Sequence, residues 1–84
     1  PAAWTRLLRE EQEANSAKIF EAHFETDGPE APCGTIDTDN RKYLRIRCAD
    51  GWIYVLSLQL SGKKRMAVQE LLLGFRDANS YVCR

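Results

Sequence analysis

The chain has 84 residues, 44% hydrophobic and 29% charged, so it has room for one small core and we expect residues 1–84 to form a single domain. No stretch approaches the roughly 20 apolar residues that cross a bilayer, so we expect no membrane-spanning helix and no membrane partner. The net charge is zero, but residues 1–40 carry three basic and nine acidic side chains (−6) and residues 41–84 carry nine basic and three acidic (+6). This asymmetry indicates either a polyanionic partner on one face or attraction between the two halves.

The first third of the chain contains one clear strand pattern and one clear loop. Near the start, the spacing of Trp4, Leu7 and Leu8 fits a helix. Residues 17–24 alternate between apolar and other side chains, which predicts a strand with one mainly buried face. Residues 26–33 contain two prolines and a glycine, and we expect a loop there, followed by a short strand near residues 35–36.

The middle of the chain predicts a hairpin. Asp39-Asn40 is a turn signal, and residues 43–48 then alternate, with Leu44, Ile46 and Cys48 on one face and a basic stripe of Tyr43, Arg45 and Arg47 on the other. Asp50-Gly51 predicts a two-residue type I′ turn, which places Ile46 opposite Val55. Beyond Val55 the apolar positions change phase to Leu56, Leu58 and Leu60, and we therefore expect a β-bulge near residues 55–56.

The last part of the chain changes to helical spacing. Val68, Leu71, Leu72 and Phe75 form one apolar stripe. No side-chain oxygen stands at residues 66–67 to cap this helix, so Ser61 or a tighter turn must supply the acceptor. About five short strands with a bulged central strand and one C-terminal helix predict a mainly β fold, a small antiparallel barrel of the oligonucleotide/oligosaccharide-binding type.

Cysteine and histidine usage argues against a metal or catalytic centre. Cys33, Cys48 and Cys83 are an odd number without CxxC spacing, which predicts reduced thiols and a cytoplasmic location. We expect Cys48 in the core, Cys33 and Cys83 in a loop or tail, and His23 on a strand. With this single histidine and no triad or paired-carboxylate spacing, the chain is expected to hold no metal, cofactor or catalytic site.

The segment LQLSGKKRMAVQELLLGFR, residues 58–76, resembles the C-terminal domain of methionyl-tRNA formyltransferases. Further landmarks of that family stand at residues 1–5, 18–19, 34–36 and 50–51, so the resemblance extends from Pro1 to about Arg76. It implies the same barrel fold. It also implies that residues 4–8 form a strand pairing with residues 18–24, and we follow it over the helical spacing, because a barrel needs its first hairpin. Residues 9–16 then form an acidic turn or a short helical excursion.

The resemblance also implies a function for the parent protein. Such an enzyme transfers a formyl group from 10-formyltetrahydrofolate to methionyl initiator tRNA, using Asn, His and Asp residues of an N-terminal catalytic domain that this chain lacks. The C-terminal domain contacts the inner side of the tRNA, and by matching positions the implied tRNA contacts are Lys63, Lys64, Arg65 and Arg76. The pattern of basic residues adds Arg45 and Arg47, beside Arg41 and Lys42, if all share one face. We expect a cytoplasmic monomer whose barrel packs on its own catalytic domain.

Two other functions remain open. Similar barrels accompany formyltransferase domains that act on folate or nucleotide-sugar substrates, where the barrel is a packing or linker module and the Lys63–Arg65 turn is merely solvated. A third interpretation takes the aromatic side chains of the barrel as a stacking platform for single-stranded nucleic acid: Trp4, Trp52, Tyr43 and Tyr54.

Overall fold

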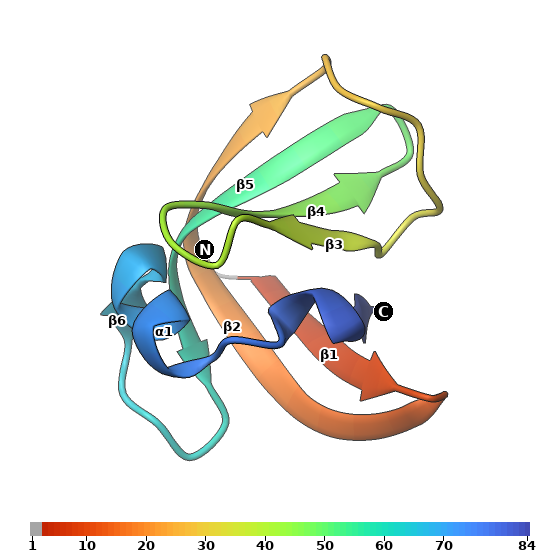
Figure 1. The fold of residues 1–84 in the computed structure, drawn as a ribbon. Coiled ribbons are helices and arrows are strands. Elements are labelled where there is room, and N and C mark those ends of the chain that lie inside the picture. Colours follow the sequence, from red (N-terminus) through yellow and green to blue (C-terminus); the bar gives the residue numbers. More distant parts are fainter. Residues whose placement is uncertain (1–2) are drawn as a thin grey trace.

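A curled antiparallel sheet dominates the structure, and one short helix lies beside one end of it (Figure 1). The computed structural model describes residues 3–84, so Pro1 and Ala2 of the N-terminal landmark lie outside the described residues. The described strands are β1 (Ala3–Arg9), β2 (Gln12–Glu25), β3 (Ile36–Thr38), β4 (Leu44–Cys48), β5 (Gly51–Leu60), β6 (Met66–Ala67) and β7 (Val82–Cys83). The described helices are α1 (Val68–Gly74) and the 3-10 turn η1 (Ala78–Ser80).

The order of the strands gives the sheet its barrel-like curvature. Within residues 3–84 the order is β3-β4-β5-β2-β1-β7, and the short β6 pairs with β5. The long strand β2 lies between β1 and β5 and bends strongly along its length (Figure 1). The predicted fold class, a mainly β antiparallel barrel with one short helix near the C-terminal end, is confirmed.

Two bulges bend the central pair of strands. Leu56 of β5 has no partner in the register between Ser57 and Val55, which confirms the predicted bulge. Phe20 of β2 is skipped in the same way between Ile19 and Glu21, so each strand contributes one extra residue. Leu56 is 49% exposed, and its predicted place in the core is therefore wrong: the bulge turns it outward. Two extra residues on facing strands add twist and let the sheet curl.

The N-terminal hairpin confirms the strand and corrects its connection. Residues 3–9 are a strand, and Trp4 pairs with Lys18, but the pairing covers residues 12–19 of β2 and not 18–24. The expected excursion over residues 9–16 is wrong, because only Glu10 and Glu11 lie in the turn. Their φ angles are 53° and 65°, and two successive positive values characterise the type I′ turn that matches strand twist. The residues that usually indicate a type I′ turn are Asn, Asp and Gly. Two glutamates do not, and the turn was therefore not predicted.

The β4–β5 hairpin forms with a different turn from the predicted one. Cys48 pairs with Gly51 and Ile46 pairs with Ile53, so the turn is Ala49-Asp50 and the predicted facing of Ile46 and Val55 is wrong. Gly51 is not among the positive-φ residues of the chain. Its lack of a side chain serves a close approach, because a Cβ there would collide with the carbonyl oxygen of Glu25 at the end of β2.

Strand β7 brings the two edges of the sheet together. It pairs with β1 through Leu7 and Cys83, and on its other side the Cys83 N–H donates to the Gly34 carbonyl at 2.8 Å. A bridge between Thr35 and Val82 completes the contact. Gly34 has φ of 92°, and a Cβ on it would collide with the Cys83 carbonyl oxygen. The barrel can therefore close at this point because Gly34, which has no side chain, lies beside β7. Neither η1 nor β7 was predicted from the sequence pattern.

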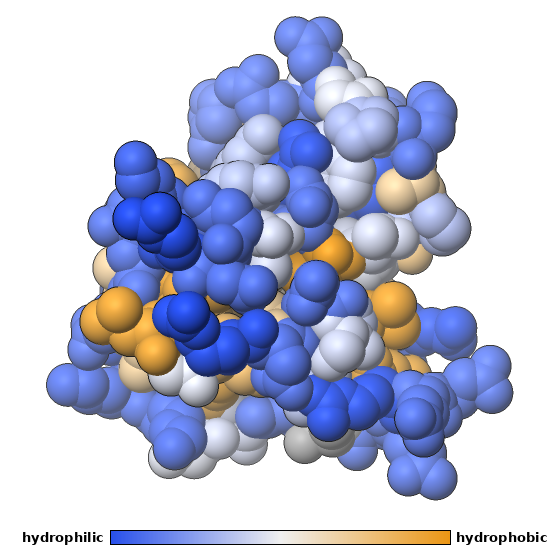
Figure 2. Space-filling view, viewed as in Figure 1, coloured by the Kyte–Doolittle hydropathy of each residue, from blue (hydrophilic) through white to orange (hydrophobic). Residues whose placement is uncertain are grey.

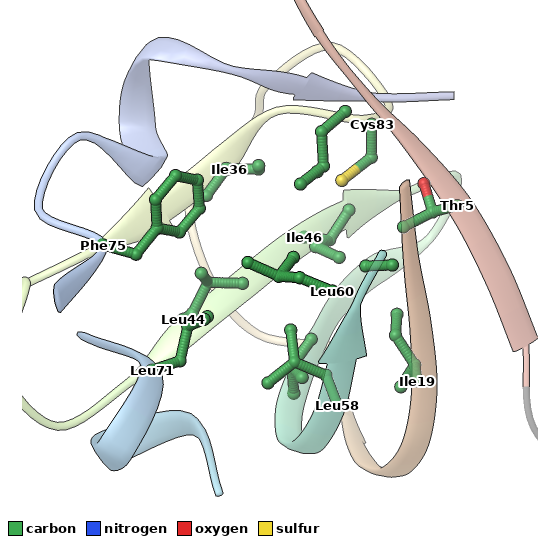
Figure 3. Close-up of a pocket in the computed structure, with 13 residues that line it drawn as sticks. Thr5, Ile19, Ile36, Leu44, Ile46, Leu58, Leu60, Leu71, Phe75 and Cys83 are labelled. Atoms are coloured by element: carbon green, nitrogen blue, oxygen red, sulfur yellow. The ribbon is translucent and has the colours of Figure 1, made fainter. Parts of the chain in front are cut away.

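The helix and the barrel interior share one core. α1 begins at Val68, the first residue of the predicted apolar stripe, and ends at Gly74, one residue before Phe75, the last of that stripe. It buries Val68, Leu71 and Leu72. No side chain caps its first turn, so of the two expected acceptors the Ser61 side chain is excluded. The Ser61 N–H pairs with the Ser16 carbonyl at 3.0 Å. Figure 3 shows apolar side chains from the strands and the helix pointing into one interior cavity. Its volume of about 20 Å³ is too small for a ligand, so the barrel interior is core.

The three thiols differ in their surroundings. Cys33 is exposed, as expected, whereas Cys83 is 7% exposed and belongs to the core cluster, so its expected place in a tail is wrong. Cys48, expected in the core, is only partly buried, and its Sγ donates to the Gly51 carbonyl at 3.3 Å. Burial raises the pKa of the Cys83 thiol, against a smaller opposing effect of the Thr5 side chain.

We predict that alkylation will separate these thiols. In the native protein at mildly alkaline pH, iodoacetamide should modify Cys33 within minutes, while Cys83 should react only after the barrel opens. Because its folded pKa is raised, Cys83 stabilises the fold fully below the pKa of the unfolded thiol, and that contribution is lost as the pH rises above it. Peptide mass spectrometry at successive times measures both rates. Equal labelling of Cys33 and Cys83 in folded protein would contradict the buried position of Cys83 in β7.

Candidate functional site

The basic turn, residues 63–65, comes after β5 and begins at the last residue of a hydrogen-bonded turn over residues 60–63. The Lys63 N–H donates to the Leu60 carbonyl at 3.0 Å, and Gly62, in the third position of this turn, has φ of 80°. A positive φ at that position is what a type II turn requires, and glycine adopts it without strain. The Gln59 side-chain amide also donates to the Lys63 carbonyl at 2.8 Å. These two hydrogen bonds fix the backbone at Lys63, the first of the three cations.

Lys63 and Lys64 point into solvent from this turn. Both are exposed, and neither side chain forms an ion pair or hydrogen bond with any residue from 3 to 84. Two adjacent ammonium groups on a fixed turn repel each other and attract any polyanion that approaches. Their charges are available to a partner outside the described chain.

Arg65 is held by the sheet instead. Its Nε donates to the Ser57 hydroxyl at 2.9 Å, and Ser57 is buried in β5. Its Nη2 lies 3.5 Å from a Glu21 carboxylate oxygen, and its guanidinium lies 4.3 Å from the centre of the Phe20 ring. The side chain is still 53% exposed. Arg65 thus anchors the basic turn to both bulged strands while one edge of its guanidinium remains in solvent.

A groove connects the basic turn to the end of the helix. It has a volume of about 420 Å³ and is lined by Asn15, Leu60, Lys63, Met66, Glu70, Leu71, Gly74 and Phe75. Arg76 follows Phe75 directly and is exposed. The viewed face is mostly hydrophilic with an apolar area over α1 (Figure 2), the helix on which Leu73 is 77% exposed. The structure therefore brings Lys63 and the Arg76 end of α1 to one groove.

Arg45 and Arg47 lie in a separate cluster and are occupied within the domain. Arg45 Nε donates to Asp37 at 2.7 Å and its Nη1 donates to the Tyr54 hydroxyl at 3.1 Å. Its guanidinium also lies 4.2 Å from the centre of the Trp52 ring. Burial, with the Asp37 carboxylate next in size, raises the pKa of the neighbouring Tyr43. The predicted basic stripe is consequently a packed and largely neutralised surface.

Arg47 is the more deeply buried of the two. Its side chain is 7% exposed and pairs with Glu30 at 3.0 Å. It also donates to the Pro29 carbonyl at 3.2 Å, and the indole N–H of Trp52 donates to the same oxygen at 3.0 Å. Arg47 is therefore occupied within the domain, where its guanidinium fastens the loop over residues 27–32 to the sheet. A sequence pattern that only alternates cannot distinguish such a buried arginine from an exposed one.

Arg41 and Lys42 lie on another turn, away from these partners. Both are exposed, and their backbone N–H groups donate to the Asp39 carboxylate at 2.9 and 2.8 Å. These hydrogen bonds, the Lys42 one first, hold the pKa of Asp39 below its usual value. This arrangement gives a second pair of exposed cations on a fixed turn, against which the Lys63-Lys64 pair can be compared.

The four aromatic residues of the predicted stacking platform do not share a surface. Trp52 is 2% exposed whereas Trp4 is 67% exposed, so Trp52 belongs to the interior and the four-residue platform is wrong. Sequence reasoning missed a different grouping around Trp4. Lys18 places its ammonium 5.4 Å from the centre of the Trp4 ring and 5.3 Å from that of Phe20. The correct hairpin register, which pairs Trp4 with Lys18, would have revealed it.

The described residues offer little support for other kinds of site. Among residues 3–84, no group of three or more His, Cys, Asp or Glu side chains is placed to hold a metal ion. No helix of that part of the chain has both the length and the apolar character needed to cross a membrane.

Comparison with known proteins gives one consistent result. The model of the family described as formyl transferase, C-terminal domain, matches residues 1–76. A methionyl-tRNA formyltransferase of Bacteroides thetaiotaomicron is 47% identical over 81 residues, which cover 96% of this chain and 25% of that protein. Those of Parabacteroides distasonis and Flavobacterium johnsoniae are 38% and 42% identical over 81 and 74 residues, covering 96% and 88% of this chain. The chain thus spans about a quarter of the length of these relatives. No solved structure matches it.

Proposed function

We propose, because this chain belongs to the formyl transferase C-terminal domain family, that it is the tRNA-positioning domain of a methionyl-tRNA formyltransferase. The observation that carries this proposal is the Lys63-Lys64 pair, which is exposed, is unpaired among residues 3–84 and begins at the last residue of a hydrogen-bonded turn. Cations of this kind bind backbone phosphates without reading sequence. A domain that holds the body of a tRNA while another domain acts on its end needs that type of contact.

The proposed contacts follow from which cations are free. Lys63 and Lys64 approach phosphates directly, Arg76 adds a cation at the helix end, and Arg65 contributes its solvent-facing edge. Arg45 and Arg47 leave the contact set, because their hydrogen bonds to Asp37, Tyr54, Glu30 and Pro29 already satisfy them. The proposed RNA footprint is therefore the basic turn and the adjoining groove.

The parent enzyme, on this proposal, formylates the amino group of methionine carried by initiator tRNA, with 10-formyltetrahydrofolate as the formyl donor. We assign the folate and the chemistry to a catalytic domain outside this chain, on which the barrel packs. We assign no catalytic, metal or cofactor role to residues 1–84. The protein acts as a cytoplasmic monomer in translation initiation.

A pair of matched double variants tests the proposal. Lys63→Ala/Lys64→Ala should weaken binding of initiator tRNA to the 84-residue chain about tenfold at low salt, because two phosphate contacts are lost. The slope of log K against log salt should fall by about 1 to 2 for the same reason. Fluorescence anisotropy at two salt concentrations measures both quantities. Arg65 is left in place because its removal would leave the buried Ser57 hydroxyl without its partner.

The control is Arg41→Ala/Lys42→Ala, which removes the same charge from the other exposed turn and should change affinity less than threefold. Circular dichroism should show both variants folded, since all four side chains are exposed. Equal losses in the two variants would mean that only net charge matters. No salt-dependent binding by the parent chain would favour the other function considered above, a packing barrel of a formyltransferase that acts on a folate or nucleotide-sugar substrate.

A further inference from the structure

A row of alternating aromatic and cationic side chains crosses the outer face of β1, β2 and the basic turn. Its members are Trp4, Lys18, Phe20 and Arg65. The Lys18 ammonium lies 5.4 and 5.3 Å from the ring centres of Trp4 and Phe20, and the Arg65 guanidinium lies 4.3 Å from the Phe20 ring centre. Each ring is in cation–π contact with a neighbour. The row therefore continues the positive charge of the basic turn across the sheet and ends at an indole.

Trp4 is exposed to an extent that core packing does not explain. It is 67% exposed, whereas Trp52, the other tryptophan of the chain, is 2% exposed. Tryptophan is highly buried on average, and an aromatic ring with a free face beside cations is the usual platform on which proteins stack a nucleobase. Lys18 covers only part of the ring, so a wide area of the indole remains in solvent.

A shallow hollow beside Trp4 joins this row to the basic turn. It has a volume of about 220 Å³ and is lined by Trp4, Lys18, Gln59, Leu60, Ser61 and Gly62. None of these residues is acidic. The carboxylate of Glu21, which follows Phe20 in β2, is paired with Arg65. Lys63 follows Gly62 directly, so a strand of RNA whose phosphates lie on the basic turn has this hollow as its neighbour.

We propose that Trp4 stacks on an unpaired nucleobase of the RNA held by the basic turn, while Lys18 contacts the phosphate next to that base. This inference rests on the proposed function and names the RNA feature that the domain recognises. An aromatic platform beside cations suits single-stranded or looped RNA, because an unstacked base offers its face to the ring and its backbone to the ammonium. An apolar protein surface would have to bury Lys18 and the neighbouring lysines without a partner, which is unfavourable.

The two tryptophans make the test direct. Stacking should quench the exposed Trp4 fluorescence on addition of unlabelled initiator tRNA, and Trp4→Phe should lose that change because Trp52 lies in the core. Trp4→Ala should weaken binding roughly 5- to 150-fold, the range for loss of one base–aromatic stack. Trp4→Phe should recover most of the affinity. The matched control is Phe24→Ala, which removes another partly exposed ring, 45% exposed, at the far end of β2 and should bind normally.

Two duplex RNAs complete the design, one fully paired and one carrying a single bulged adenosine. The proposal expects tighter binding and fluorescence quenching only with the bulged duplex, and Trp4→Ala should bind both equally. Wild-type protein that binds RNA through Lys63 and Lys64 but shows no quenching and no Trp4 effect would overturn this inference and leave the proposed function standing. Such a result would assign Trp4 to contact with another protein domain. No RNA binding at low salt would overturn both.

Discussion

Gly34→Ala should destabilise the barrel by about 3 kcal/mol or more, because two independent costs coincide at that residue. Its φ of 92° is strained for any residue with a side chain. The added methyl would also collide with the backbone carbonyl of Cys83, which cannot rotate away. A domain of this size has a total stability of about 4 to 12 kcal/mol. Urea unfolding followed by circular dichroism should show a large fall in midpoint.

Gly62→Ala is the control that separates the cost of a positive φ from the cost of the steric collision in Gly34→Ala. Its φ of 80° is also positive, but a Cβ there meets no atom within 4 Å. It should therefore cost only about 1 kcal/mol, the strain of the left-handed conformation alone. The difference between the two variants measures the contact between Gly34 and β7. If Gly34→Ala cost no more than Gly62→Ala, β7 would not be closing the barrel as the structure has it.

Trp52→Ala should cost about 3 to 5 kcal/mol, as the loss of a fully buried indole does elsewhere. The indole supports more than the core, because its N–H holds the Pro29 carbonyl and its ring lies 4.2 Å from the Arg45 guanidinium. Removing it should release the loop over residues 27–32 as well as lower the unfolding midpoint. Limited proteolysis of the folded variant should cut within that loop, and urea unfolding measures the free energy.

Trp4→Ala is the natural comparison, since the same side chain is removed from a site that is 67% exposed. It should change the free energy of unfolding by less than about 0.5 kcal/mol. The loss of unfolding free energy in Trp52→Phe should lie between those of Trp52→Ala and Trp4→Ala. Phenylalanine keeps an aromatic ring in the core, and Arg47 still donates to the Pro29 carbonyl at 3.2 Å. A Trp52→Ala protein as stable as Trp4→Ala would show that the loop and the sheet do not depend on the buried indole.

The sequence predicted correctly those parts of the fold in which the local spacing of apolar residues fits only one kind of secondary structure. The stripe of Val68, Leu71 and Leu72 predicted α1, and the phase change after Val55 predicted the bulge at Leu56. Both are local patterns of buried side chains, and burial is what hydrophobic periodicity reports. The strand over residues 4–8 was different, because its spacing also fits a helix and the family resemblance decided it.

Turns and long-range contacts were predicted less well. Asp50-Gly51 has the composition of a type I′ turn, but the observed turn is Ala49-Asp50, one residue earlier than predicted. Gly51 is required instead because the backbone of Glu25 approaches it closely. Conversely, Glu10-Glu11 forms a turn with positive φ angles that its composition does not announce. Tertiary contacts and strand twist decided both cases, and neither is visible in a short window of sequence.

In the candidate site, too, local features were predicted from the sequence and long-range contacts were not. Lys63 and Lys64 are exposed on their predicted turn, since charged residues beside glycine usually face solvent. Whether an arginine is free depends on partners elsewhere in the chain. Glu30 and Pro29 come from a distant loop to satisfy Arg47, and Glu21 of β2 pairs with Arg65. Sequence indicated the charges but not their counter-charges.

The pairing of β7 with β1 has a consequence for how the chain folds. Arg6 and Arg84 exchange two backbone hydrogen bonds, of 3.1 and 3.0 Å, across nearly the whole sequence, and contacts between such distant residues form late because the entropy of loop closure precedes their gain. During synthesis on the ribosome, β1 emerges before β7, and its outer edge stays unpaired until residues 82–84 follow. An unpaired edge invites association with other chains. The exposed charges of Arg6, Arg9 and the Glu10-Glu11 turn keep that edge soluble during the wait.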